Sequence, residues 1–236
     1  SKLEDAVRRI EEILRHIVRS LEEVVKDIEK ILRDHVRMLR EVVKRIEDVL
    51  RRVVELLRRA GDQRELVREL EELVRELVER LRRIVKRNED LVRDLLDKLR
   101  KIVKRNEKVA RELVERLRRR GESKEEAVEL LREALRLNKK SVEDIERLLK
   151  ELLDLAEESV EEIERLLRDI LKKIADVITD KDVLREVAER IRKVIERLKE
   201  LLDRSRERAE DVIKKLRDLL KENERLIEEV RRRLEK

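Results

Sequence analysis

The sequence predicts an all-α protein, a long, nearly untwisted, antiparallel up-down-up-down four-helix bundle. Hydrophobic residues make up 40% of the 236 positions and recur at helical spacing, and the chain has no aromatic residue, proline or cysteine. The helical pattern is interrupted at only three places, and an 18-residue repeat runs through each segment between them. Because eighteen residues make five turns of an unstrained helix, this repeat favours straight helices over a heptad supercoil.

The first helix is expected over about residues 2–60. Ser1 and Glu4 have the spacing of a capping box, and Gly61 follows the last helical turn, where a left-handed residue ends a helix. Its repeat places leucine at four equivalent positions: Leu3, Leu21, Leu39 and Leu57.

The second and third helices are expected over about 62–120 and 123–178. Asp62 caps the second helix and Gly121 ends it, and the motif IVKRNE occurs twice within it, exactly one repeat apart. Ser123 and Glu126 form a second capping box at the start of the third helix.

The fourth helix is expected over about 180–235, with Thr179 or Asp180 as its cap. Turns this short require sequential helices to run antiparallel. The sequence therefore predicts one four-helix bundle over residues 1–236, with helices of about 57 residues and ~85 Å each.

Charge differs between the helices in a way that favours one order. Residues 122–179 carry 11 basic and 17 acidic side chains, a net charge of −6, whereas residues 61–121 carry 20 and 14, a net charge of +6. Residues 180–236 carry 19 and 16, a net charge of +3. We expect this acidic third helix to lie between two basic neighbours, which favours the intended helix pairing.

A few polar residues fall within the apolar stripes, and they are the only candidates for chemistry. His35 occupies the position that Ile17 holds one repeat earlier. Counting from the turns predicts which residues share its height: Asn88, Ser205 and, one turn away, Ser159. We expect these side chains to form a buried hydrogen-bonded layer.

A second polar layer is expected one repeat further along the bundle. Its predicted members are Asn106, Asn138, Ser141, Asn223 and, one turn away on the first helix, Ser20. A polar group buried without a partner costs roughly 1–3 kcal/mol, so such layers penalise wrong registers and wrong oligomers. His16 falls outside the stripe of its helix, and we interpret it as a boundary or surface residue.

A metal, haem or proton site is the alternative interpretation of these layers. His16 and His35 are ~28 Å apart along one helix and cannot share an ion. No acidic residue interrupts the centre of a stripe, which excludes the glutamate and histidine set of di-iron bundles. A serine nucleophile beside His35 would need an oriented carboxylate and an oxyanion hole, and the pattern supplies neither. We expect no catalysis, no metal and no cofactor.

Composition also predicts which partners are absent. Although the net charge is +6, basic and acidic residues alternate along every helix, and no aromatic side chain is available for base stacking. No apolar run approaches the ~20 residues of a membrane span. We expect no specific nucleic acid and no membrane as a partner, and a protein that is soluble when expressed in cytoplasm.

These features together resemble computationally designed helical bundles with buried hydrogen-bond networks. The resemblance covers the whole chain and rests on the 18-residue period, the glycine helix stops, the repeated caps and the separate Asn, Ser and His layers. The Leu-Thr-Asp turn of such designs is matched by Ile178-Thr179-Asp180. Members of that family serve as rigid scaffolds, assembly modules or switches.

The resemblance implies a synthetic, hyperstable monomeric scaffold with no natural biochemical activity, in which the polar layers specify register and topology. The alternative is an assembly module, such as a homo-oligomer or one half of a designed pair, or a pH-responsive component. The wider stripes of the first and third helices, including Leu137 and Leu155 at an edge, leave the oligomer as an alternative.

Overall fold

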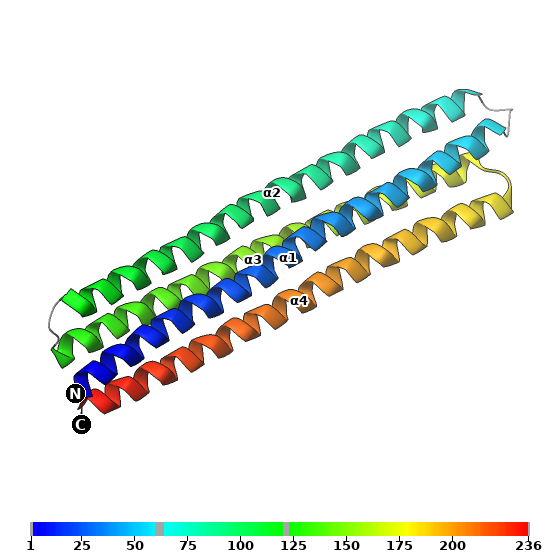
Figure 1. The fold of residues 1–236 in the computed structure, drawn as a ribbon. Coiled ribbons are helices and arrows are strands. Elements are labelled where there is room, and N and C mark those ends of the chain that lie inside the picture. The colour runs from blue at the N-terminus through cyan, green and yellow to red at the C-terminus, as the bar shows by residue number, and fades with distance from the viewer. Residues whose placement is uncertain (1, 60–63, 120–122, 236) are drawn as a thin grey trace. The chain divides into compact units, whose positions relative to one another are not determined.

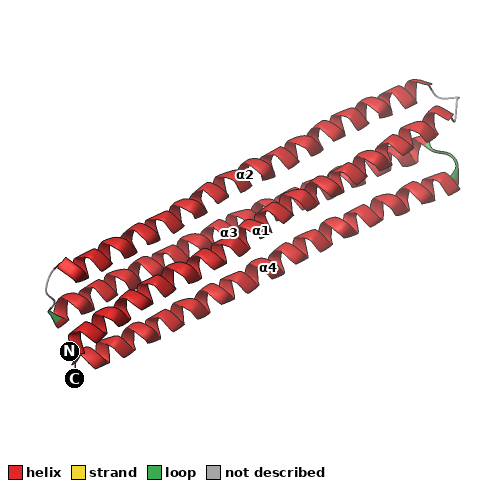
Figure 2. Cartoon of the chain, in the orientation of Figure 1, coloured by secondary structure: helices red, strands yellow, loops and turns green. Residues whose placement is uncertain are grey.

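The fold was analysed in a computed structural model that describes residues 2–59, 64–119 and 123–235. These residues contain four long α-helices and no strand (Figures 1 and 2), which confirms the predicted all-α four-helix fold. The helices are α1 (Lys2–Arg59), α2 (Arg64–Arg119), α3 (Lys124–Val177) and α4 (Lys181–Glu235).

The starts of α3 and α4 are fixed by side-chain caps. The Ser123 hydroxyl accepts a hydrogen bond from the Glu126 backbone N–H at 3.2 Å, and the Asp180 carboxylate accepts one from the Asp182 N–H at 3.0 Å. Each bond satisfies a donor that has no partner within the first turn of its helix. Of the two caps expected for α4, Asp180 therefore has that role. The expected signals at Ser1, Gly61, Asp62 and Gly121 lie outside the described residues.

The chain divides into two compact units, and each helix contributes one stretch to each unit. Unit 1 consists of Ser1–Ile31, Asp94–Lys150 and Arg208–Lys236, and unit 2 of Leu32–Arg93 and Glu151–Glu207. Each unit therefore contains parts of all four helices around its own core. The single bundle expected over residues 1–236 stays a prediction.

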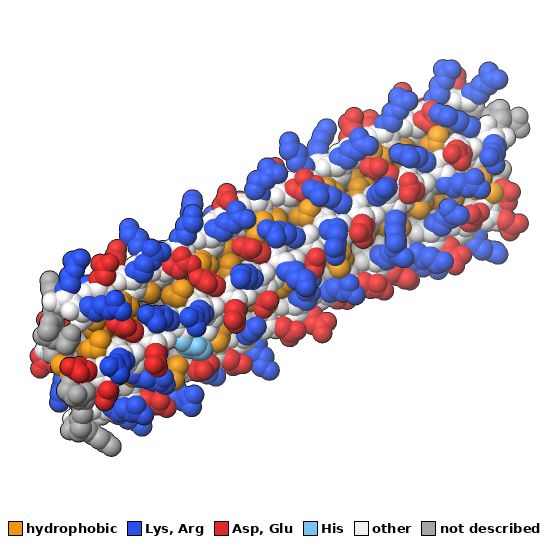
Figure 3. Space-filling view, viewed as in Figure 1, with side chains coloured by type: hydrophobic (Ala, Val, Ile, Leu, Met, Phe, Trp, Pro, Cys, Tyr) orange, Lys and Arg blue, Asp and Glu red, His pale blue; other side chains and the backbone are white. Residues whose placement is uncertain are grey.

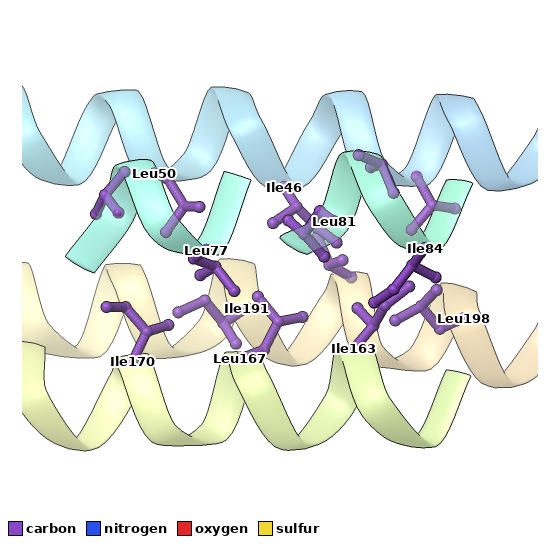
Figure 4. Close-up of a cluster of buried hydrophobic side chains, with 14 of the residues drawn as sticks. Ile46, Leu50, Leu77, Leu81, Ile84, Ile163, Leu167, Ile170, Ile191 and Leu198 are labelled. Atoms are coloured by element: carbon purple, nitrogen blue, oxygen red, sulfur yellow. The ribbon is translucent and has the colours of Figure 1, made fainter. Parts of the chain in front are cut away.

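The core of unit 2 is built from leucine, isoleucine and valine of all four helices. In Figure 4, labelled aliphatic side chains of the four helices point toward one another. Ile46 of α1, Leu81 of α2, Ile163 of α3 and Leu198 of α4 are each at most 1% exposed. Burying a side chain of this size contributes about 1.5–3 kcal/mol, so this cluster dominates the stability of the unit.

The core of unit 1 has the same composition with more alanine. Ile10 of α1, Leu113 of α2, Leu131 of α3 and Leu234 of α4 are all buried, and Ala127 and Ala134 of α3 pack among them. The aliphatic residues of each helix reach this core because their spacing keeps them on one face.

Ion pairs at the edges of each unit show that neighbouring helices run antiparallel. In unit 2, Arg40 of α1 pairs with Glu89 of α2 at 2.7 Å, and Glu47, further along α1, pairs with Arg82, which comes earlier on α2. The α2–α3 ion pairs of unit 1 and the α3–α4 ion pairs of unit 2 show the same antiparallel order.

The third helix supplies most of the carboxylates in the ion pairs that it makes with its neighbours. The α3 carboxylates that pair with basic groups of α2 or α4 are Glu133, Asp144, Glu146, Glu157, Glu158, Glu162 and Glu164. Acidic α3 thus lies beside both α2 and α4 within each unit. Basic and acidic side chains are interspersed on the face drawn in Figure 3.

Candidate functional site

The polar layer of unit 2 links three helices through one amide. Asn88 of α2 donates from Nδ2 to the Ser159 hydroxyl of α3 at 2.9 Å and to the backbone carbonyl of Ile84 at 2.9 Å. Its Oδ1 lies 3.0 Å from Nε2 of His35 on α1. All three side chains are at most 2% exposed, so these bonds are made away from water.

The two donor bonds of Asn88 fix the tautomer of His35. Because Nδ2 is used by Ile84 and Ser159, the atom that faces His35 is the acceptor Oδ1, so His35 Nε2 must carry the proton. His35 Nδ1 then holds a lone pair, and it is buried without a hydrogen-bond partner among the described residues. Burial lowers the pKa of His35 from its ordinary value of 6.5, and the bond to Asn88 offsets only part of this shift.

The polar layer of unit 1 repeats the same Asn–Ser pair without an imidazole. Asn106 of α2 donates from Nδ2 to the Ser141 hydroxyl of α3 and to the carbonyl of Ile102, both at 2.8 Å. Asn106 lies one repeat after Asn88 on α2, and Ser141 lies one repeat before Ser159 on α3, as expected for antiparallel helices that share a repeat length.

A separate amide pair joins α3 to α4 in unit 1. Asn223 Nδ2 donates to Asn138 Oδ1 at 3.2 Å, and both side chains are at most 4% exposed. Asn223 Oδ1 is buried and has no hydrogen-bond partner in the described part of the chain. The pair therefore leaves one acceptor unsatisfied, at a cost typical of an unpaired buried polar group.

The other residues that the sequence singled out do not take part in these hydrogen bonds. Ser20 and Ser205 are 8% and 6% exposed, but within the described ranges neither hydroxyl is bonded to a side chain of the two layers. His16 lies at the surface with its side chain 44% exposed, 3.7 Å from a carboxylate oxygen of Glu222.

Ser159 and His35 do not pair with each other in the described part of the chain. The Ser159 hydroxyl accepts from an amide and is not bonded to His35, whose hydrogen-bonding side chain is Asn88. Within residues 2–59, 64–119 and 123–235, no three His, Cys, Asp or Glu side chains are grouped closely enough to hold a metal ion. In the same ranges, no helix is long and apolar enough to cross a membrane.

A groove between α1 and α2 of unit 1 brings two carboxyl groups together. Its floor is Leu14, Val18, Ala110 and Val114, and its volume is about 550 Å³. Ala110 stands where the preceding repeat has the larger Val92.

The carboxyl groups of Glu22 and Glu107 meet at this groove. A hydrogen bond between the two, partial burial and their mutual repulsion raise the pKa of Glu22 above 4.5, while Lys26 and Arg19 oppose the shift. Sequence reasoning missed this pair. The IVKRNE repeat marks Glu107 as the equivalent of Glu89, which pairs with Arg40, and Glu22 takes the α1 position that Arg40 holds one repeat later.

Comparison with known proteins gives no relative to this chain. No protein-family model matches it, no curated protein matches its sequence, and no solved structure matches it.

Proposed function

We propose that this chain is a structural scaffold of designed origin, whose polar core layers specify helix register and topology and which has no natural biochemical activity. The observation that carries the proposal is that the buried amides are bonded to side chains of neighbouring helices at one particular register. Sliding a helix by one turn would bury these amides against aliphatic side chains and cost roughly 1–3 kcal/mol per unsatisfied group.

The pattern of repeats supports this role. Two repeats place Asn at the same α2 position and Ser at the matching α3 position, whereas the first α2 repeat has Leu70 there, 2% exposed. An aliphatic residue fits that position, so the amides are not needed to fill space. Their effect is to make one register more favourable than others.

A monomer is the form that the surface favours. Leu66 is the one large hydrophobic side chain in the described ranges that counts as exposed, and the edge residues Leu137 and Leu155 are half-buried. Stable association between proteins requires a larger contiguous patch than one leucine offers. The proposal therefore includes no required partner, enzyme activity or cofactor.

The test replaces the His and Asn residues of the polar layers with the aliphatic residues that stand at equivalent positions of other repeats. The variant carries His35→Ile, Asn88→Leu, Asn106→Leu, Asn138→Ile and Asn223→Val, each residue copied from an equivalent position. We expect it to resist guanidinium at least as well as the parent but to lose its single register. Light scattering should then give several masses in place of one monomer.

Register can be read directly because the chain has no cysteine. In both backgrounds, one cysteine pair replaces Arg105 and Asp144, which lie opposite each other, and a second replaces Arg105 and Lys140, one turn away. A short bifunctional reagent should link only the first pair in the parent and both pairs in the aliphatic variant. A variant that stays monomeric and links only the first pair would disprove a register-specifying role.

The expected absence of haem and zinc binding is tested separately. Titration with haem and with zinc, followed by absorbance and by thermal unfolding, should give no saturable change. Saturable binding of either one would contradict the scaffold proposal and favour a cofactor-binding bundle.

A further inference from the structure

His35 is a buried titratable side chain, and the nitrogen that would take up a second proton faces no hydrogen-bond acceptor among the described residues. Within the described residues, two buried side-chain atoms lack a hydrogen-bond partner, His35 Nδ1 and Asn223 Oδ1. An amide oxygen does not titrate near neutral pH, whereas an imidazole nitrogen does.

The geometry decides where a second proton would go. Nε2 already donates to Asn88 Oδ1, and Asn88 cannot turn its amide without losing its bond to the Ile84 carbonyl, which can only accept. The added proton must therefore sit on Nδ1. Its N–H would be buried without an acceptor, and the imidazolium would be buried without a counterion, both of which are unfavourable.

Charged side chains flank the layer on every helix of unit 2 but do not compensate this charge. The flanking groups are Asp34 of α1, Arg87 and Glu89 of α2, Glu158 of α3, and Arg204 and Arg206 of α4. Most of them form ion pairs with other surface groups: Asp34 with Arg37, Glu89 with Arg40, Arg87 with Glu158, and Arg206 with Glu157. Among the described residues, the pKa of His35 responds to burial and to Asn88, and no carboxylate stabilises the protonated ring.

We propose that His35 makes unit 2 the more acid-labile part of this chain: protonation at Nδ1 destabilises the His35–Asn88–Ser159 layer, so that acid favours opening of unit 2 over opening of unit 1. This inference goes beyond the scaffold proposal and holds whether or not the layers specify register.

Unit 1 provides the internal control because its layer has no titratable member. Asn106 and Ser141 carry the amide–hydroxyl pair, and the α1 position that corresponds to His35 is Ile17, 5% exposed. The α1–α2 register is the same in both units, since Glu47–Arg82 in unit 2 recurs as Glu11–Arg118 in unit 1, two repeats away on each helix.

The sign of the effect follows from the direction of the pKa shift. Because the folded pKa of His35 lies below 6.5, the unfolded state binds the proton more readily, and unit 2 loses stability as pH falls below about 6.5. The loss continues until pH reaches the folded pKa. In unit 1, the raised pKa of Glu22 acts in the opposite direction, because protonated Glu22 forms a hydrogen bond with Glu107, is less costly to bury and no longer repels that carboxylate.

Hydrogen exchange read by mass spectrometry measures the two units separately in the full chain. Exchange at pH 7.5 and pH 5.0 is corrected for the intrinsic rate, in enough guanidinium to bring core amides into range. We expect amides of residues 32–59 and 151–177 to lose up to about thirtyfold more protection than those of 2–31 and 124–150, from a free histidine pKa near 6.5.

Three variants assign the effect to one residue. His35→Ile copies the unit 1 layer into unit 2 and should remove the loss of protection that acid causes in unit 2. Ile17→His places an imidazole at the matching position beside Asn106 and should make unit 1 acid-labile as well. His16→Gln removes the exposed histidine of unit 1 and should leave the parent behaviour unchanged.

The proposal is overturned if both units lose protection in parallel, if His35→Ile keeps the acid-induced loss in unit 2, or if His16→Gln abolishes that loss. A folded Ile17→His variant with no added acid sensitivity would also overturn it. Where a variant fails to fold, nitrogen-15 spectra of the His35 imidazole in the parent protein test the mechanism instead. They should show the proton of His35 on Nε2 at pH 7.5, and a proton on Nδ1 at that pH would disprove the mechanism.

Discussion

The two units carry the same Asn–Ser pair between α2 and α3 but differ in what α1 places at the corresponding height. Unit 1 has Ile17 there, and unit 2 has His35, bonded to Asn88 Oδ1 at 3.0 Å. The amide–hydroxyl geometry is nearly identical in both, with donor–acceptor distances of 2.8 and 2.9 Å. The Asn–Ser pair therefore forms with or without the imidazole, and His35 adds a property, titration, rather than a necessary structural element.

The amide pair of α3 and α4 differs between the units in the same way. Unit 1 has Asn138 bonded to Asn223, and at the same α3–α4 register, two repeats away, unit 2 has Ile174 and Val187, both at most 2% exposed. One position in the repeat thus accepts a polar pair or an aliphatic pair. The comparison teaches that the repeat sets where the core lies, while the choice of residue sets how specific and how titratable each layer is.

The largest expected effect tests whether the two units are equally well packed apart from their polar layers. Leu81 in unit 2 and Leu99 in unit 1 are repeat equivalents with 0% exposure. We expect Leu81→Ala and Leu99→Ala each to lower the free energy of unfolding by about 2–5 kcal/mol, because each opens a cavity in a packed core. Guanidinium titration gives the two values, and a twofold difference between them would show that the aliphatic cores are not equivalent.

The second effect measures what the imidazole adds at neutral pH. Asn88→Leu leaves the His35 N–H and the Ser159 hydroxyl without Asn88, whereas Asn106→Leu affects Ser141 alone. We expect Asn88→Leu to cost about 1–3 kcal/mol more than Asn106→Leu at pH 7.5, since it orphans one additional buried donor. Adding His35→Ile to Asn88→Leu should recover that excess, and its persistence would show that His35 is not the cause.

Much of this arrangement follows from sequence, because the 18-residue repeat fixes both the angle of a residue around its helix and its height along that helix. Placing His35 level with Asn88 required only the helical rise and a short turn, and the two side chains are bonded. Ser159 was expected one turn from the simple count, and its hydroxyl accepts a hydrogen bond from Asn88. The all-α fold and the α3 and α4 caps follow from spacing and from single residues, Ser123 and Asp180.

The features that sequence reasoning did not reach depend on rotation and side-chain conformation. Glu22 and Glu107 both occupy polar positions of their helices, and their approach depends on how α1 and α2 are rotated toward each other. Likewise, Asn138 and Asn223 were expected at one height, but which amide atom remains unbonded is decided by side-chain torsions. The sequence repeat specifies neither the rotation of one helix toward another nor the torsions of a side chain.

A smaller effect tests whether the α3–α4 amide pair contributes to stability. Asn138→Ile alone should cost about 1–3 kcal/mol, because the Asn223 amide loses its acceptor while buried. Adding Asn223→Val copies the Ile174–Val187 pair of unit 2 and also removes the unsatisfied Asn223 Oδ1. We expect this double variant to match the parent within about 1 kcal/mol or to exceed it. A double variant weaker than the single variant would show that the amide pair is favourable as it stands.

The smallest effect concerns the Glu22–Glu107 pair, which gives unit 1 a pH response opposite to that of unit 2. Since the folded pKa of Glu22 is raised, its contribution to stability is fully present below about pH 4.5 and is lost as pH rises through the folded value. Glu22→Gln keeps a hydrogen-bond donor beside Glu107 and removes the repulsion, so the variant should be slightly more stable than the parent at pH 7 and equal to it near pH 4. Denaturant midpoints at both pH values provide the test, with Glu23→Gln as an exposed control at the next position. Equal gains from both variants would show a general effect of net charge, and only a gain specific to Glu22 would establish that the two units respond to acid with opposite sign.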